Sequence, residues 1–320
     1  PFISDMALDA LPTSGAVLVK SDMGTGKTRL AARFIDRAEQ QHKRSPRVLV
    51  ISHRQALTAD LVNRLNREGM NFESYKGLDA VDLRRIDQLG IVVNSLPKLR
   101  ASGEGSATIP VYDVVIIDEI EQVLAHLNGE TFRKSEALIT HALLKSIVAA
   151  AELVVGMDAH AGVISQTWLE NVRGSTPTVI ENRFTPTRGA LIMHADETTV
   201  ITQADTLIEE NAGVVVMPTN SRMTARKLHK RYTDKYGKSA VVMIWQDNSE
   251  SSEIQDFIAH IDERLQKLRV FIYSPSLGSG VDIQTPVRAV CALFNAVPLA
   301  ASELHQLLGR ARHPQETHVY

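Results

Sequence analysis

Residues 16–38 place a glycine-rich turn between a short apolar run and an amphipathic stretch. Residues 16–20 form a near-continuous apolar run, which is typical of a strand covered on both faces of a parallel sheet. After Thr28, apolar residues recur with the spacing of a helix. A strand that passes through a glycine turn directly into a helix begins a βαβ unit. The chain is therefore expected to fold as an open α/β sheet.

The same alternation continues along the chain and is interrupted once, around residues 182–188, where Pro186 and Gly189 break the rhythm. A length of 320 residues corresponds to about two domains at roughly 150 residues each. The sequence predicts one α/β domain over residues 1–185 and a second over residues 186–320. The predicted strands are 16–20, 48–52, 91–94, 114–118, 153–157, 190–194, 213–217, 240–244, 270–273 and 288–293, and the predicted helices include 55–69, 135–151, 221–236, 254–266 and 302–309.

Composition narrows the class of protein. Apolar residues make up 44% and charged residues 22%, which is ordinary globular usage. With 35 basic and 37 acidic residues the formal charge is −2, so a uniformly basic nucleic-acid coat is excluded while a local basic groove is not. A single cysteine, Cys291, suits a reducing compartment. No apolar run approaches the roughly 20 residues of a membrane span.

The ends of the chain add two expectations. The first residues lack the basic start of a secretory signal, so the protein is expected to be cytoplasmic, or to act at a nucleoid or elsewhere inside a host cell, and not to be secreted. The chain begins without Met and stops soon after the stretch HQLLGRARH. It is therefore expected to be part of a longer protein.

The turn SDMGTGKT, residues 21–28, predicts a phosphate-binding loop. Gly24 and Gly26 let backbone N–H groups turn inward around phosphate oxygens, and the following helix start adds a positive dipole. Lys27 is predicted to reach the β- and γ-phosphates and Thr28 to bind Mg²⁺. The remaining residues of the predicted nucleotide contact are Met23 and Thr25.

A second strand, in YDVVIIDEIEQ, ends in two carboxylates. Asp118 is predicted to hold Mg²⁺, and Glu119 to orient and deprotonate an attacking water. Acidic residues after a strand are common in any α/β protein, so this pattern has force only in combination with the glycine turn. Together the two motifs predict a nucleoside triphosphate site.

These motifs occur in an order that resembles superfamily 2 helicases, which have two RecA-like domains. SDMGTGKT and DEIE are followed by IYSPSLGSGVDI, which resembles motif V, and by HQLLGRARH, which resembles motif VI. The resemblance covers nearly the whole chain. It is strongest to herpesvirus origin-binding-protein-like helicases and to related replication proteins of phages and plasmids. It implies two tandem RecA-like domains, each a mostly parallel sheet flanked by helices.

The resemblance also implies roles in the second half of the chain. Arg310 looks like the arginine finger that stabilises charge on the transferred phosphoryl group, and Gln306 like a polar sensor beside the nucleotide. Arg312 lies two residues after Arg310, whereas many relatives have the second arginine three residues after the first, so its role as a second finger stays open. Gly280 and Asp282 are implied near the nucleotide, with an ordinary loop as the alternative for Asp282.

By the same resemblance, short polar segments after the strands line a path for a single nucleic-acid strand. Such residues offer hydroxyl, amide and backbone N–H donors that contact phosphate without reading bases. Turn or helix-cap roles are the alternative for each residue alone. The predicted contacts are Ser52, His53, Arg54, Asn94, Ser95, Thr219 and Asn220.

The sequence therefore predicts an ATP-dependent helicase or translocase that uses ATP and Mg²⁺. Its expected partners are single-stranded or tailed duplex nucleic acid, with DNA favoured by the resemblance, and further domains of a longer replication protein. Two alternatives stay open: an RNA helicase, and a nucleotide-dependent binding switch that does not translocate.

Overall fold

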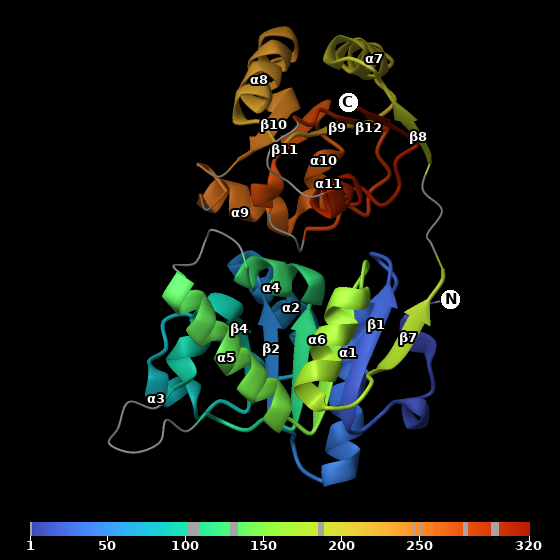
Figure 1. The fold of residues 1–320 in the computed structure, drawn as a ribbon. Helices are drawn as coiled ribbons and strands as arrows, with labels where there is room; N and C mark the ends of the chain where they lie inside the picture. Colours follow the sequence, from blue (N-terminus) through green and yellow to red (C-terminus); the bar gives the residue numbers. More distant parts are fainter. Residues whose placement is uncertain are drawn as a thin grey trace. The chain divides into compact units, whose positions relative to one another are not determined.

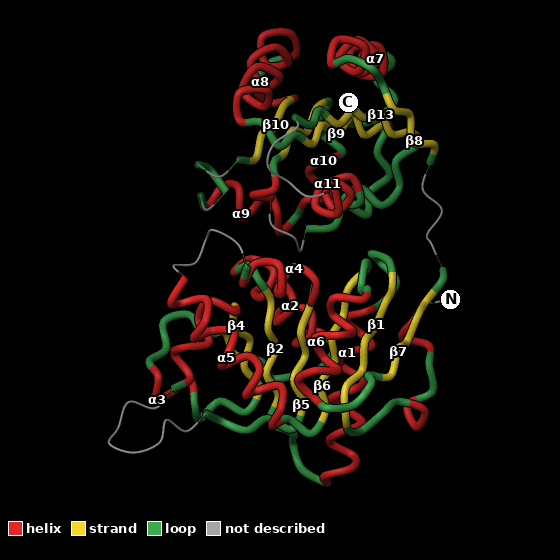
Figure 2. Tube along the Cα trace, viewed as in Figure 1, coloured by secondary structure: helices red, strands yellow, loops and turns green. Residues whose placement is uncertain are grey.

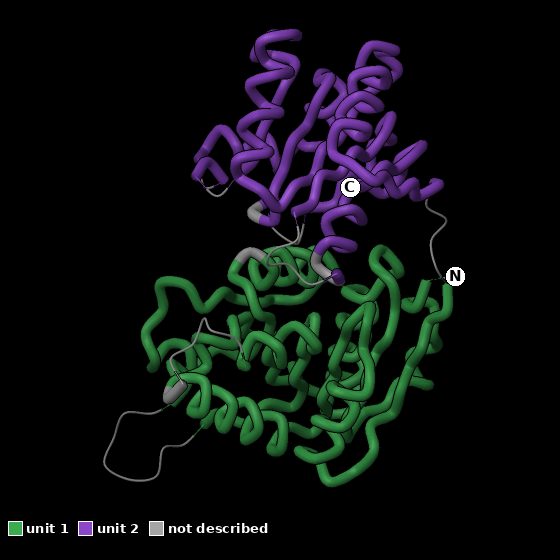
Figure 3. Tube along the Cα trace, turned by 45° about the horizontal axis from the view of Figure 1, so that its top comes forward, with its two compact units in different colours: residues 1–186 green, residues 187–320 purple. Residues whose placement is uncertain are grey.

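The computed structural model describes residues 2–100, 109–128, 134–184, 189–245, 247–249, 251–277, 281–295 and 301–320. The chain forms two compact units, Pro1–Pro186 (unit 1) and Thr187–Tyr320 (unit 2), drawn in green and purple in Figure 3. Each unit is a parallel sheet with helices on both faces, as Figures 1 and 2 show. The predicted α/β fold with two parallel sheets is confirmed.

Unit 1 contains a seven-stranded sheet in the order β3-β4-β2-β5-β6-β1-β7, and every neighbouring pair of strands is parallel. The strands are β1 (Gly15–Ser21), β2 (Val48–Ser52), β3 (Glu73–Ser74), β4 (Gln88–Val92), β5 (Val114–Asp118), β6 (Leu153–Asp158) and β7 (Thr178–Asn182). The helices are η1 (Ile3–Asp5), η2 (Leu8–Ala10), α1 (Lys27–His42), α2 (Gln55–Arg67), α3 (Ala80–Leu83), η3 (Val93–Leu99), α4 (Ile120–Leu127), α5 (Lys134–Ala150) and α6 (Val163–Arg173).

The two faces of this sheet carry separate apolar cores because side chains alternate along each strand. In β1, Val17 and Val19 pack with α1 and α2, whereas Ala16 and Leu18 pack on the opposite face with α4, α5 and α6. Burial on both faces explains the continuous Val and Ile runs in the sequence. It also fixes the register of each strand, since a shift by one residue would exchange the two cores.

All strands of unit 1 run the same way, so their carboxyl ends meet at one edge of the sheet. The chain leaves β4 at Val92, two residues before the predicted end of that strand, and enters η3. Val93, Leu96 and Leu99 are buried there, and a spacing of three residues suits a 3₁₀-helix rather than a strand. The loops after β1, β2, β4, β5 and β6 are thereby gathered on this carboxyl edge.

Helix α6 connects the two edges of the unit 1 sheet. Its last residue, Arg173, donates hydrogen bonds to the carbonyls of Val148 (2.9 Å), Ala149 (3.0 Å) and Ala151 (2.5 Å) at the end of α5. The same guanidinium reaches the carbonyl of Glu152 at 3.3 Å. Carbonyls at a helix end lack intrahelical partners, and Arg173 satisfies several of them at once.

Unit 2 contains a six-stranded parallel sheet in the order β10-β11-β9-β12-β13-β8. Helices α7 and α8 cover one face and α9, α10 and α11 the other. The predicted helix over residues 254–266 is wrong in one respect: it is divided at His260, whose backbone leaves the helical region. The elements are β8 (Ala190–Met193), α7 (Glu197–Glu209), β9 (Val215–Pro218), α8 (Arg222–Tyr236), η4 (Lys238–Ala240), β10 (Val241–Ile244), α9 (Ser252–Ala259), α10 (Ile261–Leu265), β11 (Val270–Tyr273), η5 (Pro275–Leu277), β12 (Ala289–Ala292), α11 (Ala301–Leu308) and β13 (Glu316–Val319).

Among the described residues, no helix combines the length and the apolar character that crossing a membrane requires.

Candidate functional site

The turn after β1 is shaped by two glycines in left-handed conformations, Gly24 with φ 74° and Gly26 with φ 93°. Residues with a side chain rarely adopt such angles without strain. The turn is closed from within by Thr25, whose hydroxyl lies 2.5 Å from the Ser21 hydroxyl and donates to the Asp22 carbonyl at 2.6 Å. A turn of this kind in front of a helix N-terminus forms an anion-binding concavity.

Lys27, the first residue of α1, folds back over this turn. Its Nζ donates to the carbonyls of Ser21 at 2.7 Å and Asp22 at 3.1 Å. The N–H of Met23 donates to the Asp22 carboxylate at 2.6 Å, and Thr28 follows in the first turn of α1, half-buried. The ammonium group is therefore held at the mouth of the turn by carbonyl oxygens.

The N-terminal segment supports the turn from outside, a contact that the sequence did not predict. The N–H of Ile3 donates to the carbonyl of Thr25 at 2.9 Å. A Cβ placed on Gly26 would lie only 2.9 Å from Ser4 Oγ, and Arg33 of α1 donates to the Ser4 carbonyl. Residue spacing holds no signal for this packing, because it depends on how the first residues return across the turn.

Asp118 ends β5, and the strand order β5-β6-β1 places it near the glycine turn. Burial raises the pKa of its carboxyl to about 6, although the positive charges of Lys27 and Arg64 act in the opposite direction. A carboxylate from Asp118 and a hydroxyl from Thr28 are the hard oxygen donors that Mg²⁺ prefers. The residues present therefore fit a magnesium nucleotide.

Asp158 ends β6, the strand between β5 and β1. Its carboxylate accepts hydrogen bonds from backbone N–H groups, one of which belongs to the acidic segment, residues 118–121. Its carboxylate accepts the N–H of His160 at 2.8 Å and that of Glu121 at 3.1 Å; burial raises its pKa. Glu121 in turn accepts the N–H of Gly162 (2.9 Å) and both the N–H (3.2 Å) and hydroxyl (2.7 Å) of Ser165. One carboxylate oxygen, for which the sequence suggested no role, thus fixes the start of α6 to the start of α4.

Glu119 occupies the left-handed region, with φ 52° and ψ 54°, at the residue before α4. For a residue with a Cβ this conformation costs roughly 1–2 kcal/mol. The turn lets α4 begin immediately after β5, and Gly156 of β6 gives it room, since a Cβ there would lie 2.7 Å from Ile120 Cδ1. Strain at a non-glycine residue beside polar strand ends is typical of functional sites.

The three residues after β2 that were predicted to contact a nucleic-acid strand differ in exposure. Ser52 is fully buried, and its hydroxyl lies 2.5 Å from that of Thr58. His53 is also buried, at 8% exposure, whereas Arg54 is exposed. The Ser52 hydroxyl therefore stabilises the loop, and Arg54 is the exposed residue of the three.

The neighbouring segment after β4 carries the other two predicted contacts of unit 1. Asn94 is exposed, and its Oδ1 lies 2.9 Å from His126 Nε2 of α4. Ser95 is half-buried. Because β2 and β4 are adjacent in the sheet, the structure brings these two loops together.

In unit 2 the corresponding loop follows β9. Thr219 is fully buried, and its hydroxyl accepts the N–H of Ser221 at 3.1 Å. Asn220 exchanges two hydrogen bonds with the backbone of Asn295, both 2.8 Å long. Thr219 thus shapes the start of α8, and Asn220 joins this loop to the segment after β12.

The stretch after α11 pairs with the segment before β12. Ile283 forms an isolated parallel bridge with Ala311. Arg310 is 6% exposed and donates to the carbonyl of Val281 at 3.2 Å. The two segments predicted to contact the nucleotide from unit 2 are therefore adjacent within that unit.

Arg312 pairs with Asp282, with 2.6 Å between Nη2 and Oδ1. Both side chains are largely covered, so the pair joins two residues that the sequence placed in separate motifs. Gln306 is half-buried on α11. Gly280 lies outside the described residues.

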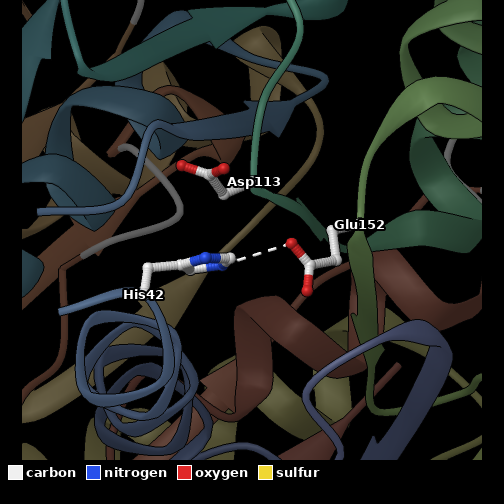
Figure 4. A group of neighbouring side chains, drawn as sticks. All are labelled: His42, Asp113 and Glu152. Atoms are coloured by element: carbon white, nitrogen blue, oxygen red, sulfur yellow. Dashed lines mark ion pairs between the residues drawn. The ribbon is translucent and has the colours of Figure 1, made fainter. Parts of the chain in front are cut away.

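A second group of titratable side chains lies at the amino edge of the unit 1 sheet (Figure 4). His42 from the end of α1 points toward Glu152, and its Nε2 lies 3.2 Å from the carboxylate. With Asp113 they form a group whose possible ligand atoms lie within 4.8 Å of one another. Arg44, however, donates to both Asp113 oxygens at 2.9 and 2.8 Å. The guanidinium takes the oxygens a cation would need, so this group acts as an ion-pair cluster.

Two curated relatives resemble the chain, both from Acanthamoeba polyphaga mimivirus. One is described as an uncharacterized putative helicase and is 25% identical over all of this chain and 30% of its own length. The other, a putative replication origin-binding protein, is 26% identical over 92% of this chain and 36% of its own length. The chain thus spans about a third of the length of these relatives.

Among solved structures, S. cerevisiae Dbp5 bound to RNA and ADP BeF3 superposes with a TM-score of 0.64 at 14% identity. The match covers 98% of this chain and 81% of that protein. At this identity the likeness shows the fold alone, which is that of two tandem RecA-like helicase domains.

The sequence also matches the family described as "Origin of replication binding protein" over residues 7–208. That range contains the glycine turn, both acidic strand ends and the loops after β2 and β4. With well over half of its residues inside the match, this chain belongs to the origin of replication binding protein family.

Proposed function

We propose that this chain is a motor that hydrolyses ATP with Mg²⁺ and moves along a single strand of DNA in replication. The observation that carries the proposal is the meeting of an anion-binding turn and two acidic strand ends, the half-buried Asp118 and the buried Asp158, at one sheet edge. There the charge of Lys27 acts on both Asp118 and Asp158. Membership of the origin of replication binding protein family supports DNA as the track.

In unit 1, the N–H groups of the turn and Lys27 would bind the β- and γ-phosphates, and Thr28 and Asp118 would hold Mg²⁺. Bound by these residues, Mg²⁺ would neutralise charge that develops on the transferred phosphoryl group. Glu119 would orient the attacking water and accept its proton. Lys27 is already drawn to oxygen acceptors of the turn, which supports its role as a phosphate ligand.

In unit 2, Arg310 would stabilise the charge on the transferred phosphoryl group, with Gln306 as a polar sensor. The resemblance of the motif supports this role for Arg310, and Arg312, which is paired with Asp282, keeps its open role as a second finger. Gly280 and Asp282 keep their proposed place in the segment that contacts the nucleotide. Hydrolysis would then require both halves of the chain, proposed as domains 1–185 and 186–320.

For the DNA strand, the proposed contacts are the exposed Arg54 and Asn94 and the half-buried Ser95 in unit 1, with the half-buried Asn220 in unit 2. Ser52 and Thr219 would act indirectly by holding these loops in shape. Such donors contact the sugar-phosphate backbone and favour no base sequence. A near-neutral chain that grips DNA through a few loops is expected to bind with marked sensitivity to salt.

RNA is the second candidate track, because the solved structure of Dbp5 contains RNA on the same fold. The test is ATPase activity measured without nucleic acid and with matched single strands of DNA and RNA. Stronger stimulation by DNA supports the proposal, and stronger stimulation by RNA selects the second candidate. ATP binding without stimulation by either would indicate a nucleotide-dependent switch.

Two substitutions test the assigned residues. Lys27→Ala removes a charge that contacts the phosphates, and a loss of about 10²- to 10³-fold in turnover is expected for one such donor. Lys145→Ala on the exposed face of α5 is its control.

Arg310→Ala is expected to cost about 10³- to 10⁵-fold in stimulated turnover while nucleotide still binds. Unchanged stimulated turnover in Arg310→Ala would show that Arg310 takes no part in hydrolysis.

A further inference from the structure

The loops after β2 and β4 and helix α4 enclose two imidazoles that the proposed ATPase chemistry does not use. His53 is 8% exposed, and among the described residues neither of its ring nitrogens has a hydrogen-bond partner. A buried polar group left in this state destabilises the folded protein. Groups of this kind call for an explanation, and a ligand that completes them is one.

The surroundings of His53 are suited to an anion. The charged groups that act on its ring are Arg54, from the same loop, and His126, from α4. The His53 and His126 ring centroids are 6.2 Å apart, and the Asn94 amide lies against His126. Two imidazoles, a guanidinium and a neutral amide therefore lie close together around His53.

The electrostatic state of the pair follows from the same contacts. Burial lowers the pKa of His53 to about 3, with Arg54 and His126 acting in the same direction. Burial and Arg54 also lower the pKa of His126. Both rings are thus neutral near pH 7 when no anion is present. An incoming phosphodiester would reverse the balance, since a nearby negative charge favours the protonated form of histidine.

We propose, resting on the function proposed above, that binding of the DNA backbone at this edge takes up a proton on the His53 and His126 pair. The strand phosphate supplies the hydrogen-bond acceptor that His53 lacks, and the proton supplies the charge that matches it. Strand affinity then rises as pH falls, in addition to the dependence on salt.

The experiment measures the Kd of a fluorescent oligo-dT strand by anisotropy at pH 6, 7 and 8 and constant ionic strength. One linked proton gives a limiting change of about tenfold per pH unit. We expect the wild-type Kd to fall toward pH 6 and His53→Asn to flatten this dependence, with His126→Asn intermediate. The control His42→Gln removes a histidine at the amino edge and should keep the wild-type slope.

A second measurement does not depend on whether the buried variant folds. Titration calorimetry of the wild-type protein with oligo-dT, in two buffers of different ionisation enthalpy at pH 7, counts protons taken up directly. Uptake approaching one proton supports the inference. Binding without uptake, or a full pH slope in folded His53→Asn, overturns it and leaves the motor function intact. Absence of strand binding at every pH would overturn both.

Discussion

The two edges of the unit 1 sheet use charge in opposite ways. At the amino edge, Asp113 receives Arg44 on both oxygens and the N–H of Arg47, and His42 lies on Glu152. At the carboxyl edge, burial raises the pKa values of Asp118 and Asp158 and lowers that of His53. The charged groups named here at the amino edge are therefore paired, whereas burial disfavours the charged forms of those at the carboxyl edge.

The carboxyl edge holds charged forms that are individually unfavourable, and strain at Glu119 adds to them. Such groups persist because the rest of the unit fixes them in place. The difference suggests where to substitute. Residues whose charged form or backbone conformation is disfavoured in the fold are candidates for function, because a bound ligand can stabilise them.

The largest expected contrast comes from removing one carboxylate at each edge. Glu119→Gln should lower ATP turnover by about 10²- to 10⁴-fold, the usual contribution of a general base, while nucleotide binding persists. Glu152→Gln, at the amino edge, should leave turnover of the folded protein unchanged. Steady-state phosphate release measures both. Equal activities in the two variants would remove Glu119 from its assigned role.

A second contrast uses two glycines, Gly15 at the start of β1 and Gly26 at the end of the turn that follows this strand. Gly26→Ala puts a Cβ 2.9 Å from Ser4 Oγ at φ 93°, whereas Gly15→Ala, at φ 85°, meets nothing within 4 Å. Both changes strain the backbone by roughly 1–2 kcal/mol. We expect that Gly26→Ala alone also weakens nucleotide binding by about tenfold. Titration with a fluorescent nucleotide gives the affinity, and similar losses in both variants would argue against the shape of the turn as the cause.

The third prediction concerns the stability of the folded chain at low pH. Because the pKa of His53 is about 3 in the folded chain and about 6.5 in an unfolded one, the unfolded state binds more protons between these values. The contribution of His53 to the free energy of unfolding is therefore complete above pH 6.5. It falls as the pH drops through that window, by about 2 kcal/mol at pH 5. Urea unfolding at pH 5 and 7 measures the loss. His53→Asn should reduce the difference, and an unchanged difference would assign it to other groups.

The smallest effect is expected at the amino edge. Burial acts to raise the pKa of Asp113, but hydrogen bonds from Arg44 and Arg47 outweigh it and hold the pKa below its usual value. Asp113→Asn should lower the free energy of unfolding by about 1–2 kcal/mol with turnover retained. Thermal unfolding beside the ATPase assay separates the two. A loss of turnover at full stability would contradict the division between the edges.

The sequence could predict the parts of this chain whose signals are local. The glycine turn, the apolar run before Asp118 and the alternation of strands and helices depend on neighbours within a few residues. Strands β7 and β13 escaped prediction because TVIEN and ETHV lack an apolar run. Their pairing with β1 and β12 places them in the sheets despite their composition.

The parts that escaped prediction at the site depend on contacts between distant segments. Ser4 against the turn, Glu121 on the start of α6 and Arg312 on Asp282 each join residues that no spacing rule connects. The same is true of His53. Its position after β2 marked it as a candidate contact, but its burial follows from the packing of distant elements around it.

Helix α6 is anchored at both ends, by Glu121 on its first turn and by Arg173 at its last residue. At 11 residues and 1.5 Å per residue it is a strut about 16 Å long. A short helix held by hydrogen bonds at both ends moves as a rigid body along its axis. A displacement of residues 118–121 would therefore reach the end of α5, at the amino edge of the sheet, and would not be absorbed within α6.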